Sequence, residues 1–86
     1  MPHTKKENIF KVFGNHERVK LLCCLSSPKS VTELLEKCTL SQSALSQHLL
    51  ILKEANLVTC VRDGKKQIYS VTNTEMLKIA NKLLAY

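Results

Sequence analysis

The stretch that decides the fold, residues 41–55, reads SQSALSQHLLILKEA. Leu45, Leu49 and Leu52 recur at the i, i+4, i+7 spacing of a buried stripe, so the stretch predicts one amphipathic helix. The opposite face is polar and almost uncharged, and its members are Gln42, Ser43, Ser46, Gln47 and Lys53. A solvated helix face is usually rich in Lys and Glu, whereas Ser and Gln suit hydrogen bonds to base edges and phosphates. We therefore interpret this stretch as a DNA recognition helix.

Composition limits the partners that the chain can bind. The 86 residues carry a net charge of +6, and 44% of them are hydrophobic, without a low-complexity tract. These values predict one globular domain over residues 1–86 that prefers a polyanion, either nucleic acid or an anionic membrane surface. The N-terminus is polar, and the longest uncharged run, residues 38–52, is too short and too polar to span a bilayer. We expect a cytoplasmic protein that does not enter a membrane.

Helix-start signals divide the first half of the chain into segments. Asn15 stands where an N-cap is expected, and Ser30 with Glu33 fits a capping box. Ser41 is the expected cap of the recognition helix. Helices are predicted over residues 5–13, 16–26, 31–38, 41–55 and 74–84. The tight turn at residues 39–40 makes the third and fourth helices a helix-turn-helix.

Beyond residue 56 the hydrophobic period changes from helical to alternating. Residues 57–62 and 67–72 are rich in β-branched and aromatic side chains, and Asp63-Gly64 between them is a hairpin signal. The hairpin tip carries the densest cationic cluster of the chain, Arg62, Lys65 and Lys66. These cations favour contact with phosphates or the minor groove; alternatively, they protect a sheet edge. The predicted fold class is mainly α with a β-hairpin, a winged helix-turn-helix of order α-α-α-α-β-β-α.

Several segments together resemble the ArsR/SmtB family of winged-helix transcriptional regulators, nearest its HlyU-type, non-metal-sensing members. The resemblance is carried by residues 10–22, 41–49, 54–58, 63–65 and 68–69. Two positions depart from the family pattern: Asn15-His16 stands where Asp-Pro is usual, and Asn56 stands where Gly is common.

The resemblance implies a homodimer formed by the first and last helices, which binds double-stranded DNA at a pseudo-palindromic operator. Half-site centres are then expected about one helical turn, roughly 10 bp, apart. Repression is expected rather than activation. The predicted DNA-binding residues are Ser41, Gln42, Ser43, Ser46, Gln47, His48, Lys53, Arg62, Lys65 and Lys66. His48 is open to two interpretations, a phosphate contact at the edge of the helix or a packed core histidine. Leu50 is expected to be exposed and Tyr69 to be part of the core.

The family's familiar metal sites have no counterpart in this sequence. Ser30 and Thr32 occupy the positions of the Cys-x-Cys ligands, and both are poor ligands for soft metals. Residues 73–86 contain no His, Asp or Cys, and His3 and His16 are isolated. We expect neither a metal nor another cofactor.

The four cysteines are expected to be thiols, because the chain is expected in a reducing compartment. Cys23 lies where HlyU-type members carry one of two reactive cysteines, but their second cysteine, on the last helix, is missing here. Cys23 is therefore a candidate redox residue that reacts alone or pairs with Cys24, Cys38 or Cys60. The alternative is that the cysteines fill the core as small hydrophobic residues.

Two other classes of function compete with a DNA-binding regulator. A winged helix that binds protein instead of DNA is compatible with an exposed Leu50 and with the missing inducer site. An enzyme is not expected, because the sequence contains no Ser/His/Asp set, no Gly-rich phosphate loop and no paired carboxylates.

Overall fold

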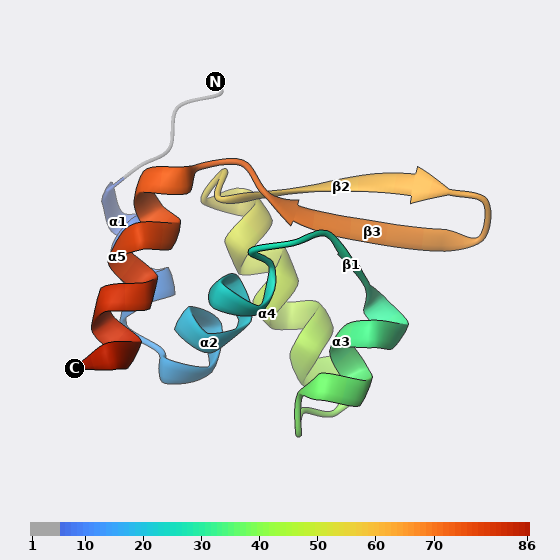
Figure 1. Cartoon of the computed structure of the whole chain (residues 1–86), viewed down its shortest axis with the longest axis horizontal. Coiled ribbons are helices and arrows are strands. Elements are labelled where there is room, and N and C mark those ends of the chain that lie inside the picture. Colours follow the sequence, from blue (N-terminus) through green and yellow to red (C-terminus); the bar gives the residue numbers. More distant parts are fainter. Residues whose placement is uncertain (1–5) are drawn as a thin grey trace.

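The computed structural model describes residues 6–86 as five helices and three strands (Figure 1). The helices are α1 (Lys6–Phe13), α2 (His16–Cys24), α3 (Val31–Lys37), α4 (Gln42–Glu54) and α5 (Thr74–Ala85). The strands are β1 (Lys29–Ser30), β2 (Val58–Asp63) and β3 (Lys66–Val71). The predicted winged helix-turn-helix is confirmed, although α2 ends two residues earlier than predicted. His3 and the predicted helix start at residue 5 lie outside the described residues.

Side-chain caps start the helices where the sequence indicates. The Asn15 side chain accepts hydrogen bonds from the backbone N–H groups of Glu17 and Arg18, at 2.9 and 3.2 Å. Ser30 and Glu33 form the predicted capping box, in which each side chain accepts from the other residue's backbone N–H. These hydrogen bonds hold the pKa of the Glu33 carboxyl below its usual range. Each cap satisfies amides that would otherwise lack a partner at the helix start.

The sheet has three strands instead of the predicted two. β3 lies in the centre and pairs antiparallel with both β1 and β2. The unpredicted strand β1 places Lys29 opposite Tyr69 and Ser30 opposite Ile68. A two-residue strand has no periodicity of its own, so its pairing with a distant strand defines it. The predicted two-stranded wing is thereby corrected to a hairpin whose base is joined by a third strand.

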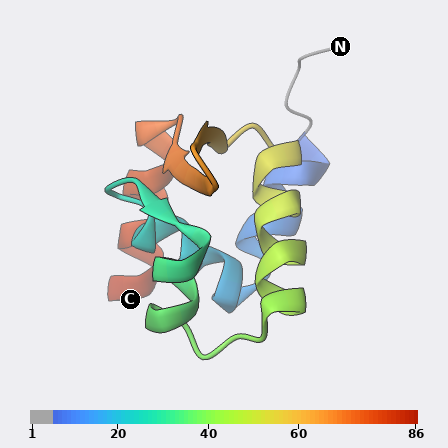
Figure 2. The same ribbon diagram turned by 90° about the vertical axis from the view of Figure 1, so that its right-hand side faces the viewer.

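The core lies between the helices and the base of the sheet. The recognition-helix stripe of Leu45, Leu49 and Leu52 is buried, as predicted. α2 contributes Leu21 and Leu22 and packs against α1, α4 and α5. Figure 2, which faces the end of the molecule that carries the hairpin tip, shows α3 and α4 on opposite sides of this end. The core therefore holds the helix-turn-helix and the wing at one end of the molecule.

A Schellman motif ends α4 and directs the chain into the wing. The N–H of Asn56 donates to the carbonyl of Lys53, and the N–H of Leu57 donates to the carbonyl of Leu52. Asn56 itself has φ of +59°, in the left-handed region. Because glycine adopts this conformation without steric cost, the family's common Gly at this position has a physical explanation. Asn is the next best residue there.

Candidate nucleic-acid interface

The solvent side of α4 is polar and exposed along its length. We call Gln42, Ser43, Ser46, Gln47 and Lys53 the reading face; all five are exposed. The Ser41 side chain caps the helix by accepting from the backbone N–H of Ala44 at 3.2 Å. Leu50 lies on the same side and is 55% exposed, as predicted. The buried leucine stripe fixes the rotation of α4, so that hydroxyl and amide groups face outward.

The hairpin tip presents three cations to solvent. We call Arg62, Lys65 and Lys66 the wing tip; all three are exposed. Gly64 has φ of +64° in the two-residue connection between β2 and β3, and its carbonyl accepts a hydrogen bond from Arg62 Nε at 3.3 Å. Neither of the two ion pairs found within residues 6–86 involves the wing tip. Three positive charges therefore lie at the end of a two-stranded arm.

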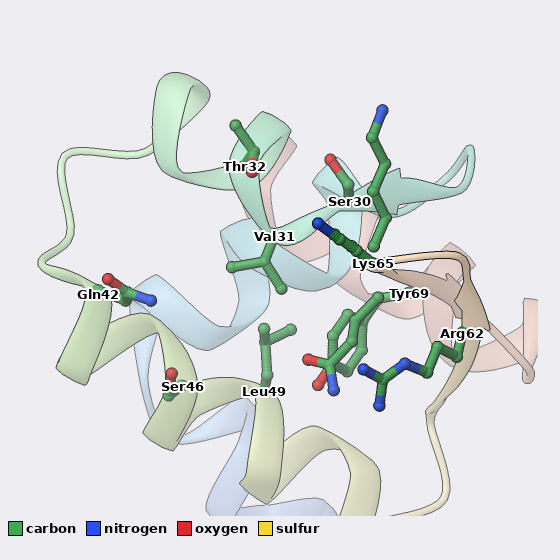
Figure 3. A pocket seen from close by; sticks show the side chains of 11 residues that line it. Ser30, Val31, Thr32, Gln42, Ser46, Leu49, Arg62, Lys65 and Tyr69 are labelled. Carbon is green, nitrogen blue, oxygen red and sulfur yellow. The ribbon is translucent and has the colours of Figure 1, made fainter.

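A groove of about 400 Å³ separates the reading face from the wing tip. Figure 3 shows Gln42 and Ser46 of α4 on one side of it and Arg62 and Lys65 of the wing on the other. Leu49 of α4 also lines the groove, and further lining comes from the end of β1, the start of α3 and the hairpin, namely Ser30, Val31, Thr32, Lys66, Gln67 and Tyr69. The fold thus brings three separate segments of the chain to one polar, cationic concavity.

The groove collects some of the predicted site residues and leaves others on adjoining surface. Gln42, Ser46 and the wing tip line it. Ser41, Ser43, Gln47 and Lys53 do not line the groove, although all four are exposed. Tyr69 packs against the core, as predicted, but it also lines the groove. Gln67 also lines the groove and was not predicted, although its place opposite Arg62 in the hairpin could have indicated it.

His48 has a partner that the sequence analysis missed. Arg18 of α2 donates from Nε to Nδ1 of His48 at 3.2 Å and from Nη1 to the carbonyl of Lys11 at 2.7 Å. Burial lowers the pKa of the His48 imidazole, and the charge of Arg18 lowers it further. His48 is only partly buried. Through Arg18, His48 links α4 to α2 and to the carbonyl of Lys11 in α1, and its contact with a phosphate stays a prediction.

The described residues contain no metal-binding constellation. No group of three or more His, Cys, Asp or Glu side chains suited to a metal ion is found within residues 6–86. Ser30 is committed to capping α3, and Thr32 faces the groove. All four cysteines are free thiols. Burial, followed by the neighbouring Cys24, raises the pKa of the Cys23 thiol, which opposes formation of a reactive thiolate.

A different surface lies at the far end of the molecule from the wing tip. We call Phe10, Ile79, Leu83 and Leu84 of α1 and α5 the apolar face; all four are exposed. Both helices lie at the opposite end from the hairpin tip (Figure 1). No helix in the described part of the chain combines the length and apolar character needed to cross a bilayer.

Comparison with known proteins gives a consistent set of relatives. The family described as "Bacterial regulatory protein, arsR family" matches residues 15–59, from the cap of α2 into β2. Transcriptional activator HlyU of Vibrio cholerae is 38% identical over 69 residues, which cover 79% of this chain and 64% of HlyU. The uncharacterized HTH-type transcriptional regulator Rv0081 of Mycobacterium tuberculosis is 38% identical over 85 residues, which cover 93% of this chain and 75% of that protein.

A solved structure shows the same fold. The transcriptional repressor BigR from Xylella fastidiosa superposes with a TM-score of 0.82 at 30% identity, over 92% of this chain and 82% of BigR. HlyU, Rv0081 and BigR are all named as regulators of transcription, and none is named as an enzyme.

Proposed function

We propose that this chain, which belongs to the arsR family of bacterial regulatory proteins, is a homodimeric, sequence-specific DNA-binding repressor. Members of this family regulate transcription and are not enzymes. The surface that contacts DNA, the dimer and the direction of regulation are the parts that we propose.

The observation that carries the proposal is the groove between the reading face and the wing tip. Its α4 side offers uncharged hydrogen-bonding groups, and its wing side offers three positive charges. DNA has the complementary arrangement, because base edges that donate and accept hydrogen bonds lie between rows of phosphates. A groove of this chemistry suits a duplex better than it suits a small ligand.

The reading face would enter the major groove and read bases. Gln42 and Gln47 can each pair with an adenine through two hydrogen bonds, and Ser43 and Ser46 can reach a base or a phosphate. Leu50, one turn beyond Ser46, would supply an apolar contact to a thymine methyl group. The wing tip would hold the backbone or the minor groove beside the bases that α4 reads.

The apolar face would form the dimer. Phe10, Ile79, Leu83 and Leu84 are exposed large hydrophobic side chains, and covering them removes apolar surface from water. A two-fold dimer formed through this face would direct both recognition helices to one side of the assembly. The operator would then be pseudo-palindromic, with half-site centres roughly 10 bp apart.

Repression is the direction that we assign. BigR is named a repressor, whereas HlyU is named an activator. A reporter gene placed behind an operator that was selected from random DNA for binding to this protein tests the assignment. Expression of the reporter should fall when the protein is supplied. Rising expression would instead make the protein an activator.

A gel-shift titration with duplex DNA tests the proposed function most simply. Binding should weaken steeply with salt, because cations that neutralise phosphates release counterions. A random duplex and an operator obtained by selection should differ in affinity by at least about 1,000-fold.

The exposure of Leu50 favours one second candidate, a winged helix that binds protein through the same face. Absence of binding to any duplex at low salt, by a folded protein, would replace DNA binding with this candidate.

A further inference from the structure

The ends of α2 and α3 each carry a cysteine. Cys24 is the last residue of α2, and Cys38 is the C-cap of α3. Both line one small cavity of about 100 Å³, together with Lys20 and Lys37. This cavity lies apart from the groove between α4 and the wing, and the two share no lining residue.

Cys24 lies close enough to Cys38 to affect the pKa of its thiol. Burial raises the pKa of Cys38, and the charge of Cys24 and a hydrogen bond with its side chain raise it further. The charge of Lys20 opposes this shift without offsetting it, so the pKa of Cys38 stays above its ordinary value. Both thiols face the same cavity, and both cysteines are partly exposed.

The other two cysteines are placed differently. Cys23 is adjacent to Cys24 in sequence, but successive residues project about 100° apart around a helix, so a disulfide between them would strain α2. Cys60 lies on β2 opposite Tyr69, in the hairpin. Cys24 and Cys38 are therefore the pair that the fold brings together from different elements.

We propose that Cys24 and Cys38 form a dithiol site that a hydroperoxide oxidises to an intramolecular disulfide. The Cys24 thiolate attacks one peroxide oxygen, the O–O bond breaks, and Cys24 becomes a sulfenic acid. The Cys38 sulfur then attacks the Cys24 sulfur, an S–S bond forms and water leaves. In total the two thiols lose two electrons and two protons, and hydrogen peroxide is reduced to two molecules of water.

The position of the two residues suits this step. A disulfide requires the sulfur atoms to approach to about 2.05 Å. Both residues lie at helix ends, where the adjoining turns can absorb a small shift more easily than a helix interior can. The bond would tie the end of α3 to the end of α2, three residues before Ser41 caps α4.

Peptide mapping of the oxidised 86-residue protein tests the proposal. The protein is treated with hydrogen peroxide, and its free thiols are blocked with N-ethylmaleimide. The monomer, meaning the chain that carries no disulfide to another chain, is then digested with trypsin without reductant. We expect a linked pair of the peptides 21–29 and 38–53, which separates on reduction. Cys24→Ser and Cys38→Ser should each lose this pair, whereas Cys23→Ser and Cys60→Ser should keep it at wild-type yield.

The four single variants decide the outcome, because Cys23 and Cys24 share one tryptic peptide. A linked pair that disappears in Cys23→Ser and persists in Cys24→Ser would overturn the assignment. No linked pair in the wild-type monomer, with peroxide consumed, would overturn it as well. Cys24→Ala and Cys38→Ala, checked by circular dichroism, replace any serine variant that does not fold.

Discussion

The two ends of this molecule expose different chemistry from the same core. At the wing end, the reading face and the wing tip expose amides, hydroxyls and three cations. At the other end, the apolar face exposes Phe10 (70%), Ile79 (45%) and Leu83 (47%). α2 packs against α1, α4 and α5, so a single core helix supports both ends. The two surfaces differ in the type of exposed side chain and not in the degree of burial, and this difference is the reason for proposing one as the DNA surface and the other as the dimer surface.

The contrast is not complete, because two apolar side chains are exposed toward the wing end. Leu50 is 55% exposed and Val61 is 59% exposed. Leu50 lies on the polar side of α4 and Val61 lies on β2 opposite Ile68, whereas the members of the apolar face share two helices. These two residues serve as matched controls for the apolar face.

The largest effect is expected from removing the three cations of the wing tip. Replacing Arg62, Lys65 and Lys66 together with Ala should weaken DNA binding by roughly 100-fold or more, because three phosphate contacts are lost. The slope of log affinity against log salt should fall by about 3. Fluorescence anisotropy with a labelled duplex over a salt series measures both.

The double variant Lys78→Ala/Lys82→Ala removes two positive charges from α5, away from the wing tip, and serves as the control for a lower net charge. Its salt slope should remain close to that of the wild type. An unchanged slope in the wing variant would remove the wing tip from the interface.

The second largest effect is expected from polar substitutions in the apolar face. Ile79→Ser with Leu83→Ser should raise the dimer dissociation constant by about 50-fold or more, because each buried aliphatic side chain contributes about 1.5–3 kcal/mol. Analytical ultracentrifugation measures the constant. The control makes the same chemical change at the other end, Leu50→Ser with Val61→Ser, and should leave the dimer intact. Equal weakening by both pairs would contradict the division of the molecule into two ends.

A third effect concerns the junction that aims the wing. Asn56 has φ of +59°, so Asn56→Ala should be less stable than Asn56→Gly by about 1 kcal/mol. Both variants lose the asparagine side chain, so their difference isolates the backbone conformation. Urea unfolding of the two variants measures it. Equal stability would mean that the left-handed conformation at residue 56 is not needed.

The smallest effect is a pH dependence of stability that arises from His48, which accepts a hydrogen bond from Arg18. The pKa of His48 is lowered in the folded protein, so the unfolded state binds the proton more readily. The contribution of neutral His48 to the free energy of unfolding is therefore fully present above the ordinary histidine pKa. It is lost as the pH falls below about 6.5. His48→Asn keeps an acceptor for Arg18 without a titrating group. Between pH 7.5 and 5 the melting temperature should therefore fall less for this variant than for the wild type. Parallel falls would exclude His48 as a source of the pH dependence.

Local signals explain why so much of the fold could be predicted. The Asn15 and Ser30 caps, the leucine stripe of α4 and the Asp63-Gly64 turn each act within a few residues of themselves. The order of helices and the hairpin followed from them. The exposed polar side of α4 also followed, because the buried stripe fixes the opposite face.

The missed features all depend on contacts between distant segments. β1 is a strand because Lys29 and Ser30 meet β3, which lies far along the chain. Arg18 reaches His48 thirty positions away, and no local pattern marks the pair. Likewise, Cys24 and Cys38 line one cavity only because the fold brings the ends of α2 and α3 together, and no local pattern in the sequence indicates this pair.

Selection of bound duplexes from a random pool, with the wild type and with Gln42→Ala/Gln47→Ala, tests the central claim most directly. The wild type should enrich a two-fold symmetric motif with half-site centres roughly 10 bp apart. The variant keeps its wing tip, so it should still bind DNA in a salt-dependent way but lose the sequence preference. Enrichment of the same motif to the same degree by the variant would contradict the assignment of α4 as the element that reads DNA.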